Sequence, residues 1–172
     1  MGLGKTIQAL CIVKKRTLVV APTSVLHNWL TEAKRFRPQL VMCLYHGTHR
    51  IYDEEADVIL TSYAILRNDI EKFKSENWNL VILDEAQAIK NPHSQTAQAA
   101  FSLRSDFRLA LTGTPVENRL EELWSQMNFL CPGLLSGVRD FRKRFEIPIS
   151  NGDMGVAKRL RERIKPLVLR RL

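Results

Sequence analysis

The chain has 172 residues, of which 45% are hydrophobic and 26% are charged. This balance is typical of one globular domain with its own core, and it excludes a disordered tail, a collagen-like repeat and a mini-protein. No apolar run approaches the roughly 18 residues of a membrane helix, and no charged-then-apolar leader opens the chain. Three widely separated cysteines fit neither a disulfide framework nor a zinc site, so we expect a reducing cytoplasm and no membrane partner.

The net charge of +8 is unevenly distributed along the chain. Residues 1–50 carry +7, residues 51–100 carry −5 and residues 101–172 carry +6. Basic ends around an acidic middle favour a partner made of phosphates, such as a nucleotide or a nucleic acid. A solvated basic face explains the same charge, so charge alone assigns no function.

Five short apolar runs predict β-strands. Continuous runs of this kind are typical of strands that are buried on both faces. The runs cover residues 17–21, 40–45, 58–61, 80–83 and 109–112. Helices are predicted over residues 25–36 and 120–129, because apolar side chains fall on one stripe of each. This alternation predicts an α/β domain with a mostly parallel sheet flanked by helices.

The last part of the chain differs in composition. Residues 139–172 hold 11 basic and 4 acidic side chains, with a turn-forming segment at residues 150–153. We interpret this part as a basic helical appendage and not as a second folded domain. The predicted division is a lobe over residues 1–135 and a helical segment over residues 136–172.

The first residues form the second half of a phosphate-binding loop. They read Met1-Gly2-Leu3-Gly4-Lys5-Thr6, and an apolar helical pattern follows. The glycines let backbone N–H groups close on phosphates, Lys5 would reach the β- and γ-phosphates, and the Thr6 hydroxyl would ligate Mg²⁺. Because a Gly-Lys-Thr run also occurs by chance, this half-motif needs support from elsewhere in the chain.

An acidic motif gives that support. Asp84 and Glu85 come directly after the apolar run 80–83, and ligands bind at the carboxyl ends of strands in open α/β sheets. Asp84 can hold the Mg²⁺ that Thr6 ligates, and Glu85 can orient or deprotonate an attacking water. An acidic pair that caps the next helix is the alternative interpretation.

A turn with two hydroxyl groups follows the last predicted strand. It reads Thr112-Gly113-Thr114-Pro115, and its residues could link a γ-phosphate site to a neighbouring surface. Turns rich in Thr, Gly and Pro are common. The turn therefore gains weight only from its position after the other two motifs.

The order of these motifs resembles a known family. The segments that carry the resemblance are residues 2–8, 21–29, 60–63, 84–91 and 111–118. They are similar to the first RecA-like lobe of Swi/Snf-type ATPases, the double-stranded-DNA translocases of helicase superfamily two, and bacterial members are more similar than eukaryotic remodellers. The resemblance spans nearly the whole chain and implies a RecA-like P-loop domain whose P-loop strand is missing.

The resemblance implies ATP and Mg²⁺ as cofactors and assigns the site residues to groups. The catalytic residues are Lys5 and Glu85. The ATP-binding residues are Gly2, Gly4, Lys5 and Thr6, and the Mg²⁺ ligands are Thr6 and Asp84. The residues that couple nucleotide state to lobe movement are Gln87, Thr112, Gly113 and Thr114. The residues that face double-stranded DNA are Pro22, Thr23, Thr61 and Ser62.

Contacts to the DNA backbone fix register without reading sequence, as a translocase requires. We therefore expect salt-sensitive, sequence-independent binding and a location in the bacterial cytoplasm at the nucleoid. The four histidines lack the spacing of metal ligands. Trp29, Trp78 and Trp124 are interpreted as core residues and not as base-stacking platforms.

The chain departs from the family pattern at both ends. The start of the loop, the strand before it and the second RecA-like lobe with its arginine finger are expected to be missing. Loss of a central strand would leave two neighbouring strands with unpaired apolar edges. An arginine finger contributes roughly 10³–10⁵ in rate, so we expect no useful ATPase activity from this chain alone, although its parent would be a DNA-stimulated ATPase.

Two other functions fit parts of the sequence. A non-catalytic truncated remnant would at most bind nucleic acid or nucleotide, and binding of Mg·ATP would count against it. A different P-loop enzyme, such as a small-molecule kinase, lacks an acceptor-binding segment here and leaves residues 112–115 unexplained.

Overall fold

Five parallel strands form one sheet in the computed structural model, which describes residues 4–113 and 120–169. The strand order is β2-β3-β1-β4-β5. The strands are β1 (Thr17–Ala21), β2 (Met42–Leu44), β3 (Val58–Ser62), β4 (Asn77–Leu83) and β5 (Arg104–Ala110). Every residue of β1 and β3 is buried, which explains the unbroken apolar runs that predicted these two strands.

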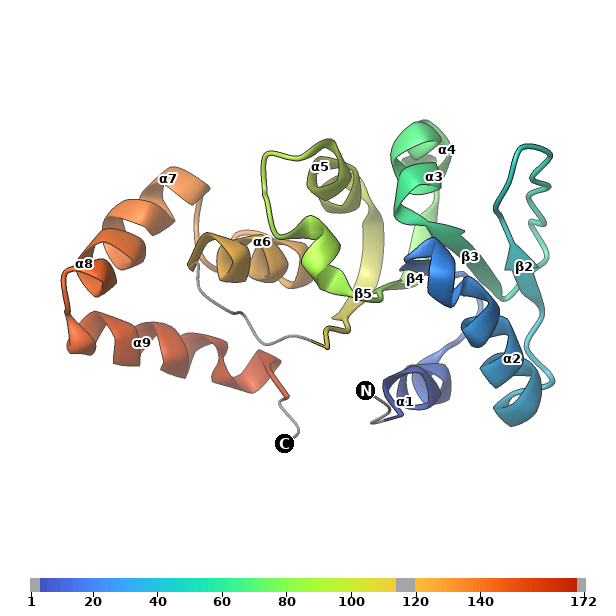
Figure 1. The fold of residues 1–172 in the computed structure, drawn as a ribbon, viewed down its shortest axis with the longest axis horizontal. Helices are drawn as coiled ribbons and strands as arrows, with labels where there is room; N and C mark the ends of the chain where they lie inside the picture. Colours follow the sequence, from blue (N-terminus) through green and yellow to red (C-terminus); the bar gives the residue numbers. More distant parts are fainter. Residues whose placement is uncertain (1–3, 114–119, 170–172) are drawn as a thin grey trace.

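Helices cover both faces of the sheet (Figure 1). One face carries α1 (Lys5–Ile12) and α2 (Leu26–Phe36), and the other carries α3 (Tyr63–Asn68), α4 (Ile70–Ser75) and α5 (Gln95–Ser102). Successive residues of β1 belong to different cores, since Val19 packs with α1 and α2 whereas Leu18 and Val20 pack with α3, α4 and α5. The predicted α/β fold is confirmed, and the helix expected over residues 25–36 is α2.

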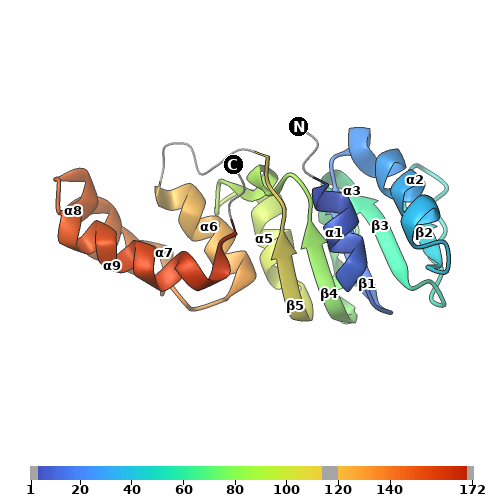
Figure 2. The same cartoon turned by 90° about the horizontal axis from the view of Figure 1, so that it is seen from below.

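The C-terminal helices extend beyond the β5 end of the sheet (Figures 1 and 2). They are α6 (Leu120–Leu130), α7 (Val138–Phe141), a π-helical turn (Arg142–Glu146), α8 (Ile147–Ser150) and α9 (Met154–Ile164). Their apolar side chains form a third core, in which Trp124 of α6 packs with Phe141 and Leu160. The appendage is helical as predicted, and the proposed division after residue 135 stays a prediction. No helix in residues 4–113 or 120–169 is long and apolar enough to cross a membrane.

β5 is an edge strand of the described sheet. It begins at Arg104, earlier than predicted, because its first residues are mostly exposed and include polar ones that an apolar run does not contain. The expected pair of neighbouring strands with unpaired edges is wrong for the described residues, since the five strands pair without interruption. The unpaired edges lie instead at β2 and β5, and Phe107 of β5 exposes 72% of its surface.

Replacing Phe107 by Lys is expected to reduce self-association of the chain without lowering its stability. An exposed aromatic residue on an unpaired strand edge favours edge-to-edge pairing, which a lysine opposes. Ile51→Lys is a matched control, because Ile51 is 80% exposed and lies outside the strands. Size-exclusion chromatography with light scattering should show fewer oligomers for Phe107→Lys only, and equal effects of the two variants would contradict an edge-specific cause.

Candidate active site

The predicted motifs meet at the carboxyl edge of the sheet. Asp84 and Glu85 follow β4, and Thr112 and Gly113 follow β5, the neighbouring strand. Figure 2 shows the start of α1 at the same edge. Residues far apart in the sequence are therefore neighbours here, as the shared direction of parallel strands requires.

Lys5 and Glu85 approach each other around Gly113. Gly4 caps α1 with a φ of 65°, which glycine adopts without a Cβ clash, and Lys5 is the first residue of the helix. A methyl group on Gly113 would lie 3.5 Å from Lys5 Nζ and 3.6 and 3.7 Å from the two carboxylate oxygens of Glu85. The Gly113 N–H donates to Glu85 Oε2 at 3.4 Å. A cation, an N–H group and a carboxylate thus surround one point, an arrangement suited to binding a phosphate beside an activated water.

Glu85 is held in a strained backbone conformation by a network of hydrogen bonds. Its φ of 49° and ψ of 56° are left-handed, a state that costs a non-glycine residue on the order of 1–3 kcal/mol. Gln87 Nε2 donates to Glu85 Oε2 at 2.9 Å, and the Thr112 hydroxyl donates to Gln87 Oε1 at 3.2 Å. The Ala86 N–H donates to the Leu111 carbonyl at 2.8 Å. Gln87, Thr112 and Gly113 are therefore brought to Glu85, while their coupling role stays a prediction.

Asp84 is buried, and both its carboxylate and its backbone have partners. It is 8% exposed. Oδ1 accepts the Glu85 N–H at 2.9 Å, and Oδ2 accepts the indole N–H of Trp29 at 2.9 Å. The Asp84 N–H donates to the Val20 carbonyl at 2.8 Å, and the Asp84 carbonyl accepts from the Tyr63 hydroxyl at 2.8 Å. Because a buried carboxylate is costly without partners, these bonds both stabilise Asp84 and fix its orientation.

Sequence reasoning missed the contribution of Trp29 and Tyr63 to this site. Trp29 lies in the core as predicted, at 1% exposure, but its polar edge reaches Asp84. Burial raises the pKa of Tyr63, and the charges of Asp84 and Glu85 raise it further, so the hydroxyl stays protonated and keeps donating. No spacing rule could have found these contacts, because 55 and 21 residues separate the partners along the chain.

The residues predicted to face DNA lie directly after β1 and at the end of β3. Thr23 is exposed and Pro22 half-buried at the start of a short 3-10 turn. Thr61 and Ser62 are buried, and their hydroxyls form hydrogen bonds within the protein. The Thr61 hydroxyl donates to a backbone carbonyl at 2.8 Å, and the Ser62 hydroxyl caps α3. The DNA contact of all four residues stays a prediction.

A magnesium site here would depend on few protein ligands. Thr6 lies in the first turn of α1, whereas Gly2 and Thr114 lie outside the described residues. Within residues 4–113 and 120–169 no group of three or more His, Cys, Asp and Glu side chains could hold a metal ion. Oxygen ligands from Asp84 and Thr6 fit Mg²⁺, which is usually held by one or two carboxylates together with substrate phosphates.

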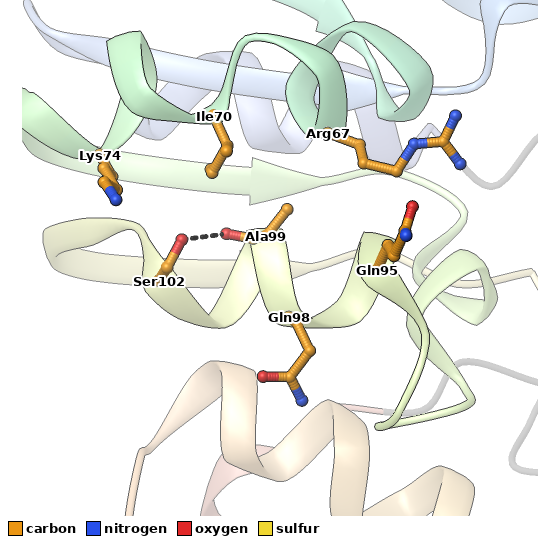
Figure 3. Close-up of a pocket in the computed structure, with 7 residues that line it drawn as sticks. All are labelled: Arg67, Ile70, Lys74, Gln95, Gln98, Ala99 and Ser102. Atoms are coloured by element: carbon orange, nitrogen blue, oxygen red, sulfur yellow. Dashed lines mark hydrogen bonds between the residues drawn. The ribbon is translucent and has the colours of Figure 1, made fainter.

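Two cavities lie away from this edge of the sheet. One of about 370 Å³ lies where α3 and α4 face α5, and Figure 3 shows Arg67, Lys74 and Gln95 among its lining residues. The other, of about 280 Å³, lies between the π-helical turn and α9. Neither of these two cavities is lined by Lys5, Asp84, Glu85 or Gly113.

The parallel sheet, the lysine at a helix start and the acidic strand end together define a RecA-like P-loop lobe. Residues 1–172 match the SNF2-related domain family, and the chain belongs to this family. The expected fold and family are thereby confirmed.

Known relatives of the chain come from distant organisms. It is 41% identical over 188 residues to the putative ATP-dependent helicase/translocase YwqA of Bacillus subtilis, with 99% of this chain and 20% of that protein covered. It is 36% identical over 190 residues to the human SWI/SNF-related matrix-associated actin-dependent regulator of chromatin subfamily A member 1, with 100% of this chain and 18% of that protein covered. The chain therefore spans about a fifth of the length of these relatives.

Solved structures show the same fold. The Sulfolobus solfataricus SWI2/SNF2 ATPase core in complex with dsDNA matches with a TM-score of 0.93 at 41% identity, covering 99% of this chain and 38% of that chain. The SWI2/SNF2 ATPase core domain of the same organism matches with a TM-score of 0.89 at 41% identity, covering 99% of this chain and 37% of that chain.

Glu85→Gly is expected to be more stable than Glu85→Ala by about 0.5–1 kcal/mol. Both variants lose the carboxylate, but only glycine adopts the left-handed conformation without the cost of about 1–2 kcal/mol that a Cβ brings. This gain exceeds the roughly 0.4–1 kcal/mol that glycine loses through its freer unfolded chain. Urea denaturation measures the difference, and a more stable Glu85→Ala would contradict the strain at this position.

Proposed function

We propose that this chain is the ATP-binding lobe of an enzyme that hydrolyses ATP to translocate on double-stranded DNA. The observation that carries this proposal is the meeting of the Lys5 ammonium, the Gly113 N–H and the Glu85 carboxylate around one point. Membership of the SNF2-related domain family and similarity to an ATPase core in complex with dsDNA support the same function.

The site residues divide the work of ATP hydrolysis. Lys5 and the backbone of Gly2 and Gly4 bind the phosphates, while Thr6 and Asp84 hold Mg²⁺. When bound, the metal ion neutralises charge on the phosphates. Glu85 orients the attacking water and accepts its proton, at a position fixed by the bonds from Gln87 and Gly113. Gln87, Thr112, Gly113 and Thr114 transmit the nucleotide state to the rest of the motor.

The partners are double-stranded DNA and a second RecA-like lobe. Pro22, Thr23, Thr61 and Ser62 mark the segments that approach the DNA backbone, and binding is independent of sequence because phosphates carry no base identity. The second lobe supplies the arginine finger. A protein that acts on double-stranded DNA would work at the nucleoid of the bacterial cytoplasm, and we propose this location for the chain.

Lys5→Ala is expected to weaken binding of Mg·ATP at least tenfold. Hydrogen bonds to charged groups contribute about 1.5–3 kcal/mol, and about 1.4 kcal/mol corresponds to a factor of ten. Lys14→Ala is the matched control, because Lys14 is an exposed lysine that follows α1. Isothermal titration calorimetry gives both affinities, and equal affinity of wild type and Lys5→Ala would contradict the proposed phosphate site.

The 172-residue chain is expected to release no useful amount of phosphate from ATP, with or without duplex DNA. Its proposed partner lobe would supply an arginine finger worth roughly 10³–10⁵ in rate. A colorimetric assay of phosphate release measures this. DNA-stimulated turnover that Lys5→Ala abolishes would show that the chain hydrolyses ATP without a second lobe.

A further inference from the structure

Asp84 receives hydrogen bonds from two helices that pack on opposite faces of the sheet. The indole N–H of Trp29 in α2 donates to Asp84 Oδ2 at 2.9 Å. The hydroxyl of Tyr63, the first residue of α3, donates to the Asp84 carbonyl oxygen at 2.8 Å. One bond holds the side chain and the other holds the backbone, so the position of Asp84 depends on both helices.

These two helices follow the segments that are proposed to face DNA. One short 3-10 turn separates Pro22 from the start of α2. α3 starts directly after Thr61 and Ser62, and the Ser62 side chain caps it. Each segment is therefore joined directly to a helix that holds Asp84.

The Trp29 bond differs from those of the other two tryptophans. The indole of Trp78 donates to the Phe73 carbonyl at 2.9 Å, and that of Trp124 donates to the Ser136 carbonyl at 3.1 Å. Trp29 instead donates to a carboxylate, and hydrogen bonds to charged acceptors are roughly twice as strong as neutral ones. Because Trp29 is 1% exposed, water cannot replace this donor. Trp29 thus does more than fill the core.

The two bonds to the carboxylate leave it able to bind a metal. Oδ1 accepts the Glu85 N–H and Oδ2 accepts the Trp29 indole N–H, while each carboxylate oxygen can accept more than one bond. The plane of the carboxylate is therefore fixed while lone pairs stay open. Loss of a partner that orients a metal ligand in this way typically lowers metal affinity by roughly 10–100-fold.

We propose that Trp29 and Tyr63 are positioning residues that hold Asp84 in the orientation needed for Mg·ATP and tie it to the DNA-facing segments. Neither residue touches the nucleotide in this proposal. Trp29 acts on the carboxylate from α2, and Tyr63 acts on the backbone from α3. The inference rests on the proposed function, and its tests separate the two.

The first test follows the indole N–H signals in the ¹⁵N NMR spectrum of the chain. Asp84→Asn is expected to shift the Trp29 signal and to leave the Trp78 and Trp124 signals in place. An unmoved Trp29 signal would overturn the proposal. If Asp84→Asn does not fold, hydrogen exchange in the wild type decides, because a bonded Trp29 N–H must be protected as strongly as that of Trp78.

The second test separates metal positioning from packing by calorimetry with ATP, in Mg²⁺ and in EDTA. Trp29→Phe is expected to weaken binding about tenfold in Mg²⁺ and to leave binding in EDTA unchanged. The matched control is Trp78→Phe, which removes another buried indole donor, one that bonds the Phe73 carbonyl near the start of β4 and not Asp84. An equal loss of affinity in Mg²⁺ and in EDTA, or an equal loss for Trp78→Phe, would show that Trp29 contributes only packing.

Tyr63→Phe removes only the hydroxyl that holds the Asp84 backbone. Like Trp29→Phe, it is expected to weaken ATP binding in Mg²⁺. Tyr45→Phe is its control, because the Tyr45 hydroxyl donates to the Asp69 carboxylate at 2.8 Å outside the site. Equal behaviour of the two tyrosine variants would exclude Tyr63 from the proposed role.

The tie to the DNA-facing segments is tested by adding a 20-base-pair duplex to the labelled chain. Saturating duplex is expected to move the Trp29 signal and not the Trp78 signal. If the duplex binds and the Trp29 signal does not shift, the proposed link between Asp84 and the DNA-facing segments is wrong.

The proposal and the proposed function can fail separately. If the wild-type chain binds neither Mg·ATP nor duplex, the proposed function is wrong for this chain, and so are the metal and DNA parts of the inference. The Asp84→Asn spectrum still decides then whether Trp29 holds Asp84. If the wild type binds Mg·ATP and Trp29→Phe binds it equally well, the proposed function stands and the positioning role of Trp29 is wrong.

Discussion

The buried carboxylate of Asp84 is the constraint around which the strand-end site is organised. A buried charge is tolerated only where hydrogen bonds replace water, and the Asp84 carboxylate accepts such bonds from the Trp29 indole of α2 and from the Glu85 N–H. The Asp84 backbone bonds Val20 of β1 and Tyr63 of α3. The hydrogen bonds of this one residue at the end of β4 therefore hold three elements around it. Hydrogen bonds to a charged group contribute about 1.5–3 kcal/mol, a large share of the roughly 5–15 kcal/mol that stabilises a domain.

The strain at Glu85 follows from the same arrangement. With Asp84 fixed, the left-handed conformation of Glu85 turns the chain so that the Ala86 N–H meets the Leu111 carbonyl just beyond the end of β5. The Glu85 side chain is then directed to Gly113, where it accepts the backbone N–H and lies close to Lys5. A strained residue persists only where its surroundings over-determine it, and the hydrogen bonds on both sides of Glu85 meet that condition.

The sequence contained enough to predict that Lys5, Glu85 and Gly113 meet, because motifs at the carboxyl ends of parallel strands share one edge. The start of β5 was missed because the mostly exposed residues at its beginning, such as Arg104, include polar side chains and form no apolar run. The Trp29 contact could not be predicted. Helical periodicity shows that Trp29 faces the core, but it does not identify the polar group that it meets across 55 residues of sequence.

The turn after Glu85 is also held from the side of the appendage. Ser125 of α6 donates its hydroxyl to the Ile89 carbonyl, at the end of the 3-10 turn Ala86–Ile89. Ser125 is 0% exposed, so water cannot take over this bond, and a displacement of α6 that preserves it must move Ile89. The neighbouring Trp124 packs in the core of the appendage. The net charge changes from −5 over residues 51–100 to +6 over residues 101–172. This change does not divide the protein into two independent units, because buried contacts of α6 join the turn after Glu85 to the core of the appendage.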